Sequence, residues 1–156
     1  MNKSDIFDSV YKRLENDLPQ YLTYHDAEHT KTVIKKSVFL AEKENLSESE
    51  IDLIKIAALY HDAGFIVGRE NHEDKSCELA KKQLPEFNYS GEQIKLICGM
   101  INATRIPQIT NNIYEDIIAD ADLFYLGTED YDYYSDKLYK ELKHSQPELT
   151  EKEWIK

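Results

Sequence analysis

A His–Asp dipeptide, His61-Asp62, closes the apolar run at residues 51–60. More histidines and aspartates stand in two pairs on either side of it, His25 with His29 and Asp120 with Asp122. Imidazole nitrogens and carboxylate oxygens together form a mixed ligand set, which suits a divalent metal ion rather than a structural thiolate zinc site. If these side chains converge, the chemistry that they indicate is metal-assisted hydrolysis.

The two outer pairs differ in what their spacing permits. His25 and His29 are four residues apart, so on a helix both imidazoles project from one face, about one turn apart. Asp120 and Asp122 are two residues apart, and on a helix they point about 200° from each other. Both therefore cannot approach one ion from the same helix face, and periodicity alone does not choose between them.

The central dipeptide also has a structural interpretation. A histidine at a helix end can stabilise the last carbonyl groups, and Asp62 can start a turn at Ala63-Gly64. The apolar run before the dipeptide predicts a helix that is buried over much of its surface. An aspartate at the end of such a helix is costly unless a cation or hydrogen bonds compensate its charge.

The elements that must position these residues are helices, because nearly every segment has helical rather than alternating periodicity. Ser47, Ser90 and Thr150 each precede a periodic segment and are followed three residues later by Glu or Gln, which is typical of a helix start. No convincing strand run or Asn-Gly hairpin turn occurs. The sequence predicts an all-α, single-domain helical bundle spanning 1–156, with helices at about 4–18, 26–45, 48–62, 71–84, 91–104, 112–126, 130–144 and from 151 onward.

Two of these helices have unusual compositions. The helix expected at 130–144 begins with acidic residues and with Tyr131, Tyr133 and Tyr134, which either stack on a base or, as we favour, pack at the helix start with hydrated hydroxyl groups. The last helix is too short to be stable alone, because the chain ends two residues after Trp154. Either the sequence is truncated there, or this segment packs Trp154 onto the body of the protein.

Composition narrows the class of protein. At 156 residues the chain is long enough for one domain with a hydrophobic core and short for two. Its formal net charge of −11 argues against a general nucleic-acid or anionic-membrane surface. No apolar stretch approaches the roughly 20 residues of a membrane span. Without a signal-peptide core at the N-terminus, we expect a soluble, cytoplasmic protein.

The two cysteines, Cys77 and Cys98, fall in different predicted helices and lack C-x-x-C spacing. We expect two reduced, half-buried thiols, with neither a disulfide nor a role in metal binding.

Taken together, the motifs resemble the HD-domain metal-dependent phosphohydrolase superfamily. The resemblance is carried by YHDAEHT at 24–30, AALYHDAGF at 57–65, ENHE at 70–73 and IADADLFYLG at 118–127. It covers roughly residues 20–130. No single segment is specific, but the ordered set is.

The resemblance implies a set of metal ligands and an acid. It makes His29, His61, Asp62 and Asp122 the metal ligands; Asp122 is preferred over Asp120 because of its context, Ala121-Asp122-Leu123. The opening motif is also similar to that of the cyclic-nucleotide phosphodiesterases, in which the first histidine protonates the leaving oxygen, so His25 is the candidate acid. Those enzymes have Asn where this chain has Asp26.

His72 is the one histidine between His61-Asp62 and the final aspartate, so the resemblance implies one tightly held metal. We expect His72 to line the pocket or to contribute to a weak second metal site. Asp120 is then a supporting group or a residue of the helix flank.

The expected activity is metal-dependent phosphohydrolysis of a small phosphate ester, a nucleotide being the expected substrate, with monoester and diester both open. Two histidines and two aspartates leave positions for water on a six-coordinate ion, which favours Mn, Fe, Co, Ni or Mg. The metal would activate water, Asp62 or Asp122 would orient it, and His25 would protonate the leaving group. Candidate substrate contacts are Lys36, Arg69 and Arg105. The alternative is a nucleotide-binding or signalling module of the same type that has no turnover; a purely structural helical scaffold would require the motif order to be accidental.

Overall fold

The structure, a computed structural model, describes residues 3–154, and none of them lies in a strand. The helices are α1 (Lys3–Asp17), α2 (Ala27–Lys43), α3 (Glu48–Tyr60), α4 (His72–Gln83), α5 (Gly91–Ala103), α6 (Ile113–Asp122), α7 (Tyr131–Ser145) and α8 (Glu151–Trp154). Three short 3₁₀ helices join them: η1 (Ala63–Ile66), η2 (Leu84–Phe87) and η3 (Phe124–Gly127). The prediction of an all-α fold is confirmed.

Side-chain caps begin the helices at the positions where the sequence predicts them. Ser47 and Ser90 each accept a hydrogen bond from the third residue of their helix, whose Glu50 or Gln93 side chain accepts one from the cap's own N–H. Thr150 forms the same reciprocal pair with Glu153 at the start of α8. These contacts satisfy backbone groups that have no partner within the helix, which is why the helix starts are readable from the sequence.

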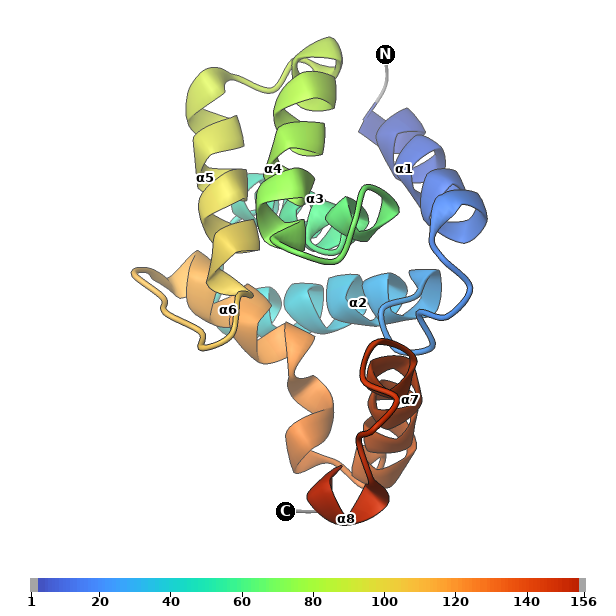
Figure 1. Ribbon diagram of the computed structural model, residues 1–156. Coiled ribbons are helices and arrows are strands. Elements are labelled where there is room, and N and C mark those ends of the chain that lie inside the picture. Colours follow the sequence, from blue (N-terminus) through green and yellow to red (C-terminus); the bar gives the residue numbers. More distant parts are fainter. Residues whose placement is uncertain (1–2, 155–156) are drawn as a thin grey trace.

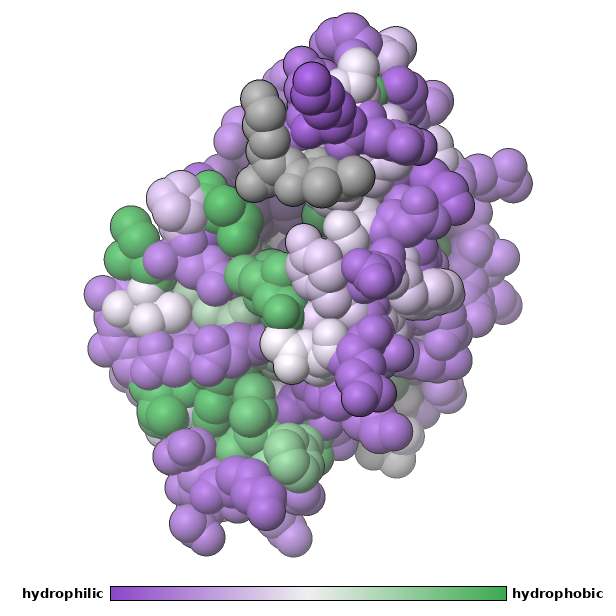
Figure 2. Space-filling model, turned by 90° about the horizontal axis from the view of Figure 1, so that it is seen from below, coloured by the Kyte–Doolittle hydropathy of each residue, from purple (hydrophilic) through white to green (hydrophobic). Residues whose placement is uncertain are grey.

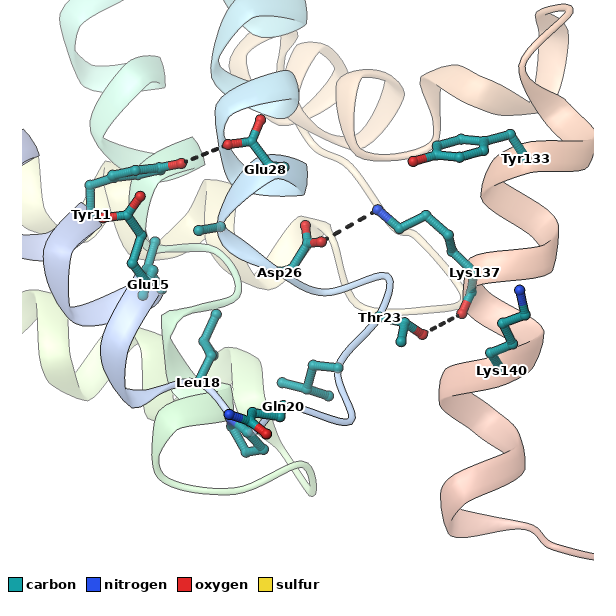
Figure 3. Close-up of a pocket in the computed structure, with 14 residues that line it drawn as sticks. Tyr11, Glu15, Leu18, Gln20, Thr23, Asp26, Glu28, Tyr133, Lys137 and Lys140 are labelled. Atoms are coloured by element: carbon teal, nitrogen blue, oxygen red, sulfur yellow. Dashed lines mark hydrogen bonds and ion pairs between the residues drawn. The ribbon is translucent and has the colours of Figure 1, made fainter.

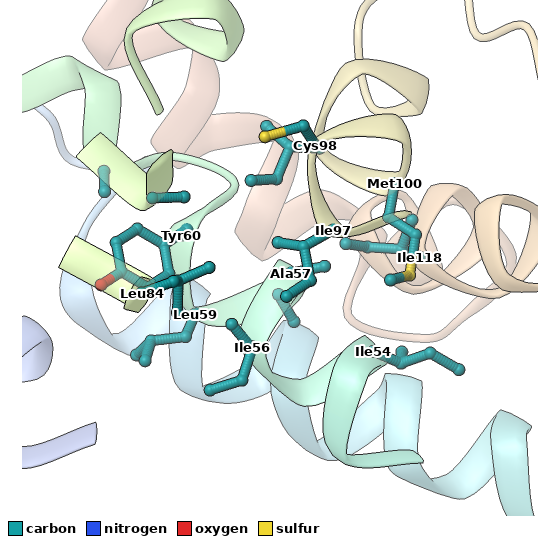
Figure 4. Close-up of a cluster of buried hydrophobic side chains, with 14 of the residues drawn as sticks. Ile54, Ile56, Ala57, Leu59, Tyr60, Leu84, Ile97, Cys98, Met100 and Ile118 are labelled. Carbon is teal, nitrogen blue, oxygen red and sulfur yellow. The ribbon is translucent and has the colours of Figure 1, made fainter. Parts of the chain in front are cut away.

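The hydrophobic core is centred on α3, which contacts α1, α2, α4, α5 and α6. Its second half is buried all round, since every residue from Ile56 to Tyr60 is at most 1% exposed. These side chains belong to one buried cluster with Ile97, Met100 and Ile118 from α5 and α6, and Figure 4 shows Ala57 beside Ile97. A helix that is apolar on every side is stable only inside a protein, so α3 fixes the centre of the molecule and the position of the residues that follow it.

Several helices are shorter than the sequence predicts, and two of them, α3 and α6, end at or next to site residues. The helix expected at 48–62 ends at Tyr60, and the helix expected at 112–126 ends at Asp122 and continues as η3. In each case the chain passes into a 3₁₀ segment, which has helix-like apolar spacing and therefore looks like a continuation in the sequence.

α7 lies apart from the core helices and extends beneath α2, with α8 folded back at its lower end (Figure 1). Trp154 packs on α7, because its indole N–H donates to the Ser135 hydroxyl at 3.0 Å and its ring lies 6.0 Å from that of Tyr139. This is the packing that the sequence offers as one of two interpretations. Residues 155 and 156 of the expected last helix lie outside the described residues.

The face seen from below in Figure 2 is largely hydrophilic, and its apolar side chains form separate groups. Among residues 3–154, no helix is both long enough and apolar enough to cross a membrane.

The two cysteines are more deeply buried than expected. Cys77 is 4% exposed and Cys98 is 8% exposed, so the prediction of half-buried thiols is wrong. The thiol of Cys77 lies 3.6 Å from the carbonyl oxygen of Cys98, across the interface between α4 and α5. Both residues are free cysteines. They lie on the inner faces of two packed helices, which is a common environment for unpaired cysteine.

Candidate metal centre

Four side chains, from two helices and from the turn that follows α3, meet at the end of the core. His29 comes from α2, His61 and Asp62 follow α3, and Asp122 is the last residue of α6. Each offers one nitrogen or oxygen atom, and these atoms all lie within 4.8 Å of one another. His29 Nε2 lies 3.0 Å from an oxygen of Asp122, and His61 Nε2 lies 3.1 Å from an oxygen of Asp62. The two Nε2 atoms are 3.4 Å apart.

The local backbone explains how His61 and Asp62 both face this point. His61 caps the C-terminus of α3, and its Nδ1 lies 2.7 Å from the carbonyl oxygen of Ala58. Since a carbonyl only accepts, Nδ1 carries the proton and donates, which leaves Nε2 free toward the cluster. Asp62 stands at the start of η1 but makes no capping hydrogen bond with its side chain. The structural role of a helix-end histidine and the role of a ligand are therefore compatible.

The turn after Asp62 is held by α4. The Ser76 hydroxyl donates to the His61 carbonyl at 2.9 Å and accepts from the Gly64 N–H at 2.8 Å. A Cβ atom on Gly64 would lie 1.9 Å from the His72 carbonyl oxygen, so only glycine lets the first turn of α4 pack this closely. Ser76 is a supporting residue that sequence reasoning missed.

The structure separates the two aspartates that periodicity leaves equivalent. Asp122 faces the cluster, whereas Asp120 is exposed on the flank of α6. Ala121, between the two aspartates, and Ala119, before the first of them, are both buried. The arrangement therefore agrees with the choice of Asp122.

Burial and charge oppose each other in the cluster. Burial raises the pKa of the Asp62 carboxyl, but attraction to the imidazoles of His61 and His25 outweighs burial and holds that pKa well below its ordinary value. Burial lowers the pKa of His61, but the carboxylates of Asp62 and Asp122 outweigh it and raise that pKa well above its ordinary value. Two buried carboxylates thus favour positive charge between them, either as imidazolium or as a bound cation.

The residues present fit a divalent cation. Oδ2 of Asp62 is buried, lies 3.1 to 3.4 Å from two imidazole nitrogens, and has no hydrogen-bond partner. An unpartnered buried carboxylate oxygen is costly unless a cation completes its environment. With an Nε2 lone pair from His61 beside it, this oxygen belongs to a donor set of the kind that binds Mn, Fe, Co or Ni. His29 Nδ1 is also without a partner, so His29 lacks the supporting contact that His61 has.

His25 lies next to the cluster but is held by a different element. Its ring is 5.8 Å from the His29 ring, and its Nδ1 lies 2.6 Å from an oxygen of Glu141 on α7. The ring also stacks on Phe65, with centroids 4.7 Å apart. His25 thus lines the approach to the cluster rather than joining it.

The remaining candidate residues divide between the cavity and other parts of the surface. His72 stacks on Phe65 at 4.0 Å, and its Nε2 lies 3.3 Å from an oxygen of Asp62. Arg69 and Arg105 both line the cavity, and each already pairs with acidic groups. Lys36 lies elsewhere, with its Nζ 5.1 Å from the centre of the Phe124 ring, so its predicted contact with substrate is not supported.

A cavity of about 370 Å³ opens over the cluster. Aromatic and aliphatic side chains form much of its wall, and Arg69, Arg105, His25 and His72 supply polar groups; the apolar lining is Tyr24, Phe65, Ile106, Leu123, Tyr125, Leu138 and Leu142. Its volume is at the small end of the range for ligand sites, roughly 300–1,000 Å³.

The residue of this site that sequence reasoning missed most clearly is Glu141. It is fully buried, and it lies on α7 at the spacing of the apolar residues Tyr134, Leu138 and Leu142. A carboxylate on an otherwise apolar helix stripe is the signal that was available, because such a charge needs a buried partner.

The comparisons with known proteins agree with this geometry. The family model described as HD domain matches residues 26–126. The fold is similar to that of a crystal structure described as a predicted HD superfamily hydrolase, from an uncultured Thermotogales bacterium, with a TM-score of 0.64 and 19% identity over 93% of this chain and 90% of that one. No curated protein matches the chain. The family model spans well over half of the chain and includes all four residues of the cluster, and the chain therefore belongs to the HD domain family.

Proposed function

We propose that the protein is a metal-dependent phosphohydrolase that cleaves a small phosphate ester, with a nucleotide as the substrate class. Membership of the HD domain family supports metal dependence. The buried donor set at the bottom of the cavity supports a hydrolytic centre, and the small volume of that cavity favours a small substrate over a polymer.

The ligands in this proposal are His29, His61, Asp62 and Asp122. A divalent cation bound to them would supply a lowered pKa for a water molecule and neutralisation of charge on the phosphoryl oxygens. The carboxylates of Asp62 and Asp122 are acceptors at the pH of the cell, because both pKa values are held low by the neighbouring imidazoles against the opposing effect of burial. Either carboxylate is able to orient water by accepting its hydrogen bond.

The leaving group is protonated by His25. The ring lines the cavity, its Nδ1 is engaged by Glu141, and Nε2 is the nitrogen that remains for the substrate. Burial lowers the pKa of His25, but attraction to the carboxylates of Asp62 and Glu141 outweighs burial and leaves this pKa above its ordinary value. The two carboxylates thus favour the protonated form of His25, which is the form that a general acid needs.

The substrate's phosphate is recognised by the cationic groups of the cavity wall. Arg69 pairs with Glu141 at 3.2 Å and Arg105 with Asp74 at 2.9 Å, so both guanidinium groups are already oriented. Tyr24, Phe65 and Tyr125 offer aromatic surface for a base or another flat group.

The convergence of four donor atoms within 4.8 Å carries this proposal. The direct experiment assays phosphatase and phosphodiesterase substrates with Mn, Fe, Co, Ni and Mg, comparing the wild type with Asp62→Ala. The proposal predicts metal-dependent hydrolysis that is lost in the variant. Full activity in Asp62→Ala would refute the mechanism, and tight nucleotide binding without product under all five metals would favour the non-catalytic module instead.

A further inference from the structure

Glu141 makes an unusual number of contacts for one carboxylate. Its Oε2 accepts hydrogen bonds from the backbone N–H groups of Tyr24 and His25, at 2.9 and 2.8 Å. Its Oε1 lies 2.6 Å from Nδ1 of His25 and 3.2 Å from the guanidinium of Arg69. The side chain of Glu141 is 0% exposed, whereas its partners His25 and Arg69 are 19% and 29% exposed at the cavity.

These contacts fix both the backbone and the ring of one residue. A single carboxylate holds the His25 amide with one oxygen and the His25 imidazole with the other, which restrains the position of Cα and the rotation of the side chain together. Phe65 covers one face of the same ring. A residue needed only to anchor the loop would not have to reach the imidazole.

The loop between α1 and α2 does not depend on Glu141 alone for its attachment to α7. The Thr23 hydroxyl donates to the Lys137 carbonyl at 2.7 Å, and the Lys137 ammonium lies 3.3 Å from the Asp26 carboxylate (Figure 3). These contacts lie beside a cavity of about 650 Å³ that is separate from the candidate metal centre. Lys137 and Glu141 thus both attach α7 to this loop, but only Glu141 contacts the His25 imidazole.

We propose that Glu141 is a positioning residue, which orients His25 and fixes the proton on its Nδ1 so that Nε2 faces the leaving group. The inference rests on the proposed phosphohydrolase function. His25 and Glu141 both lie outside residues 26–126, the part of the chain that matches the HD domain model. The arrangement is thus a property of this chain's loop and of α7.

The proton balance of the step is simple. As the bond between phosphorus and the leaving oxygen breaks, that oxygen takes the proton from Nε2 of His25. The imidazole becomes neutral with its remaining proton on Nδ1, donated to Glu141, which stays a carboxylate. The attacking water releases one proton when its oxygen bonds to phosphorus, and His25 regains a proton from solvent. Glu141 keeps the ring in the tautomer that leaves Nε2 free to exchange.

The test is Glu141→Gln, which preserves the size of the side chain. The Gln amide presents an N–H group to Nδ1, so His25 shifts its proton to Nε2 and becomes a poor acid. We expect kcat to fall roughly 10²-fold for a nucleoside monophosphate, whose alcohol must be protonated to leave. For p-nitrophenyl phosphate, whose phenolate leaves without a proton, we expect little change. Mn²⁺ affinity should stay near that of the wild type, and a change in KM that arises through Arg69 should be the same for both substrates.

Two controls distinguish a role of Glu141 in orienting His25 from a role in attaching α7 to the loop between α1 and α2. Lys137→Met removes the ion pair to Asp26 from the same face of α7 and should leave the rates on both substrates unchanged. His25→Ala should show the same dependence on the leaving group, and adding Glu141→Gln to it should cost nothing more, because one residue acts through the other. If Glu141→Gln cannot be purified, Glu141→Asp serves, because the shorter side chain cannot reach both the amides and the ring.

An NMR measurement gives a readout that does not depend on turnover. Long-range ¹H–¹⁵N spectra of the neutral ring should place the His25 proton on Nδ1 in the wild type and on Nε2 in Glu141→Gln. The inference is overturned by an unchanged tautomer, by equal losses on the two substrates, or by additive losses in the double variant. Wild type that hydrolyses neither substrate overturns the proposed function instead, and the tautomer measurement still decides whether Glu141 orients His25.

Discussion

The four candidate metal ligands lie beside the part of the cavity wall formed by His25 and its partner Glu141, which we call the His25 wall. The two regions are positioned in different ways. His29 and Asp122 project from α2 and α6, and His61 directly follows α3; these three helices pack against one another around the core. His25 stands in a loop and is held from α7 by the buried carboxylate of Glu141. The cluster is thus positioned by apolar packing, and the wall is positioned by a few hydrogen bonds.

The difference matters because the two kinds of support respond differently to change. A site on packed helices moves only if the core moves, since protein interiors are close-packed. A site on a hydrogen-bonded loop depends on each partner, because removing one leaves another polar group buried and unsatisfied. We expect single substitutions to affect the wall selectively, and to affect the cluster only at its ligands or at points of close packing.

The largest effect is expected at the ligands themselves. Asp122→Ala should weaken Mn²⁺ binding beyond the roughly 10- to 100-fold loss that is typical of supporting residues. It should also abolish the rise in Tm that ligand binding to the folded state produces. The matched control is Asp120→Ala, two residues away and exposed. Calorimetric titration checks both, and equal loss in the two variants would mean that the choice between the aspartates is wrong.

The next effect tests close packing beside the cluster. Gly64→Ala places a Cβ 1.9 Å from the His72 carbonyl and 2.7 Å from the Ser76 nitrogen, which are backbone atoms that cannot move without α4. We expect the free energy of unfolding to fall by about 1–3 kcal/mol or more, and His72 to shift with α4. Gly91→Ala is the control, because nothing lies within 4 Å of its added Cβ. Urea unfolding compares the two, and an equally stable Gly64→Ala variant would contradict the packing described here.

The smallest effect concerns the pH dependence of the His25 wall. Burial raises the pKa of Glu141, but His25 and the two backbone amides outweigh it and hold this pKa below the ordinary 4.5. The pKa of His25 is raised above the ordinary 6.5, since the attraction of the Asp62 and Glu141 carboxylates exceeds the lowering by burial.

The signs of these shifts define a window. A depressed carboxyl pKa stabilises the fold above about pH 4.5 and loses that effect as pH falls through the folded value; a raised histidine pKa stabilises below about pH 6.5 and loses its effect as pH rises through the folded value. The stability difference between the wild type and Glu141→Gln should be largest between these limits. Urea unfolding with a chelator at about pH 3.5, 5.5 and 8.5 measures it. A difference that is constant with pH would show that the contact carries no charge.

The same contrast explains which features of the structure can be predicted from the sequence. Helix starts at Ser47, Ser90 and Thr150 are predictable because a cap and its partner are three residues apart. The cluster is predictable in composition because its residues belong to ordered local motifs. The choice between Asp120 and Asp122 depends on where α6 ends and on how it packs. Helix periodicity predicts neither the end of the helix nor its packing.

The His25 wall is much less visible in the sequence. Glu141 is 116 residues from His25, and no local spacing connects them. Lys36 is the opposite case, because it follows His29 on α2 but lies over Phe124 and is not among the residues that line the cavity. Long polar contacts and the reach of long side chains are decided by tertiary packing, which one sequence without its fold does not display.

The central claim is that His29, His61, Asp62 and Asp122 hold one divalent cation. The most direct measurement is anomalous diffraction at the manganese edge from crystals grown with Mn²⁺. The account predicts one strong peak about 2.0–2.6 Å from an atom of each of these four side chains. A peak elsewhere, or ordered crystals with the four side chains clustered and no peak at saturating Mn²⁺, would contradict it.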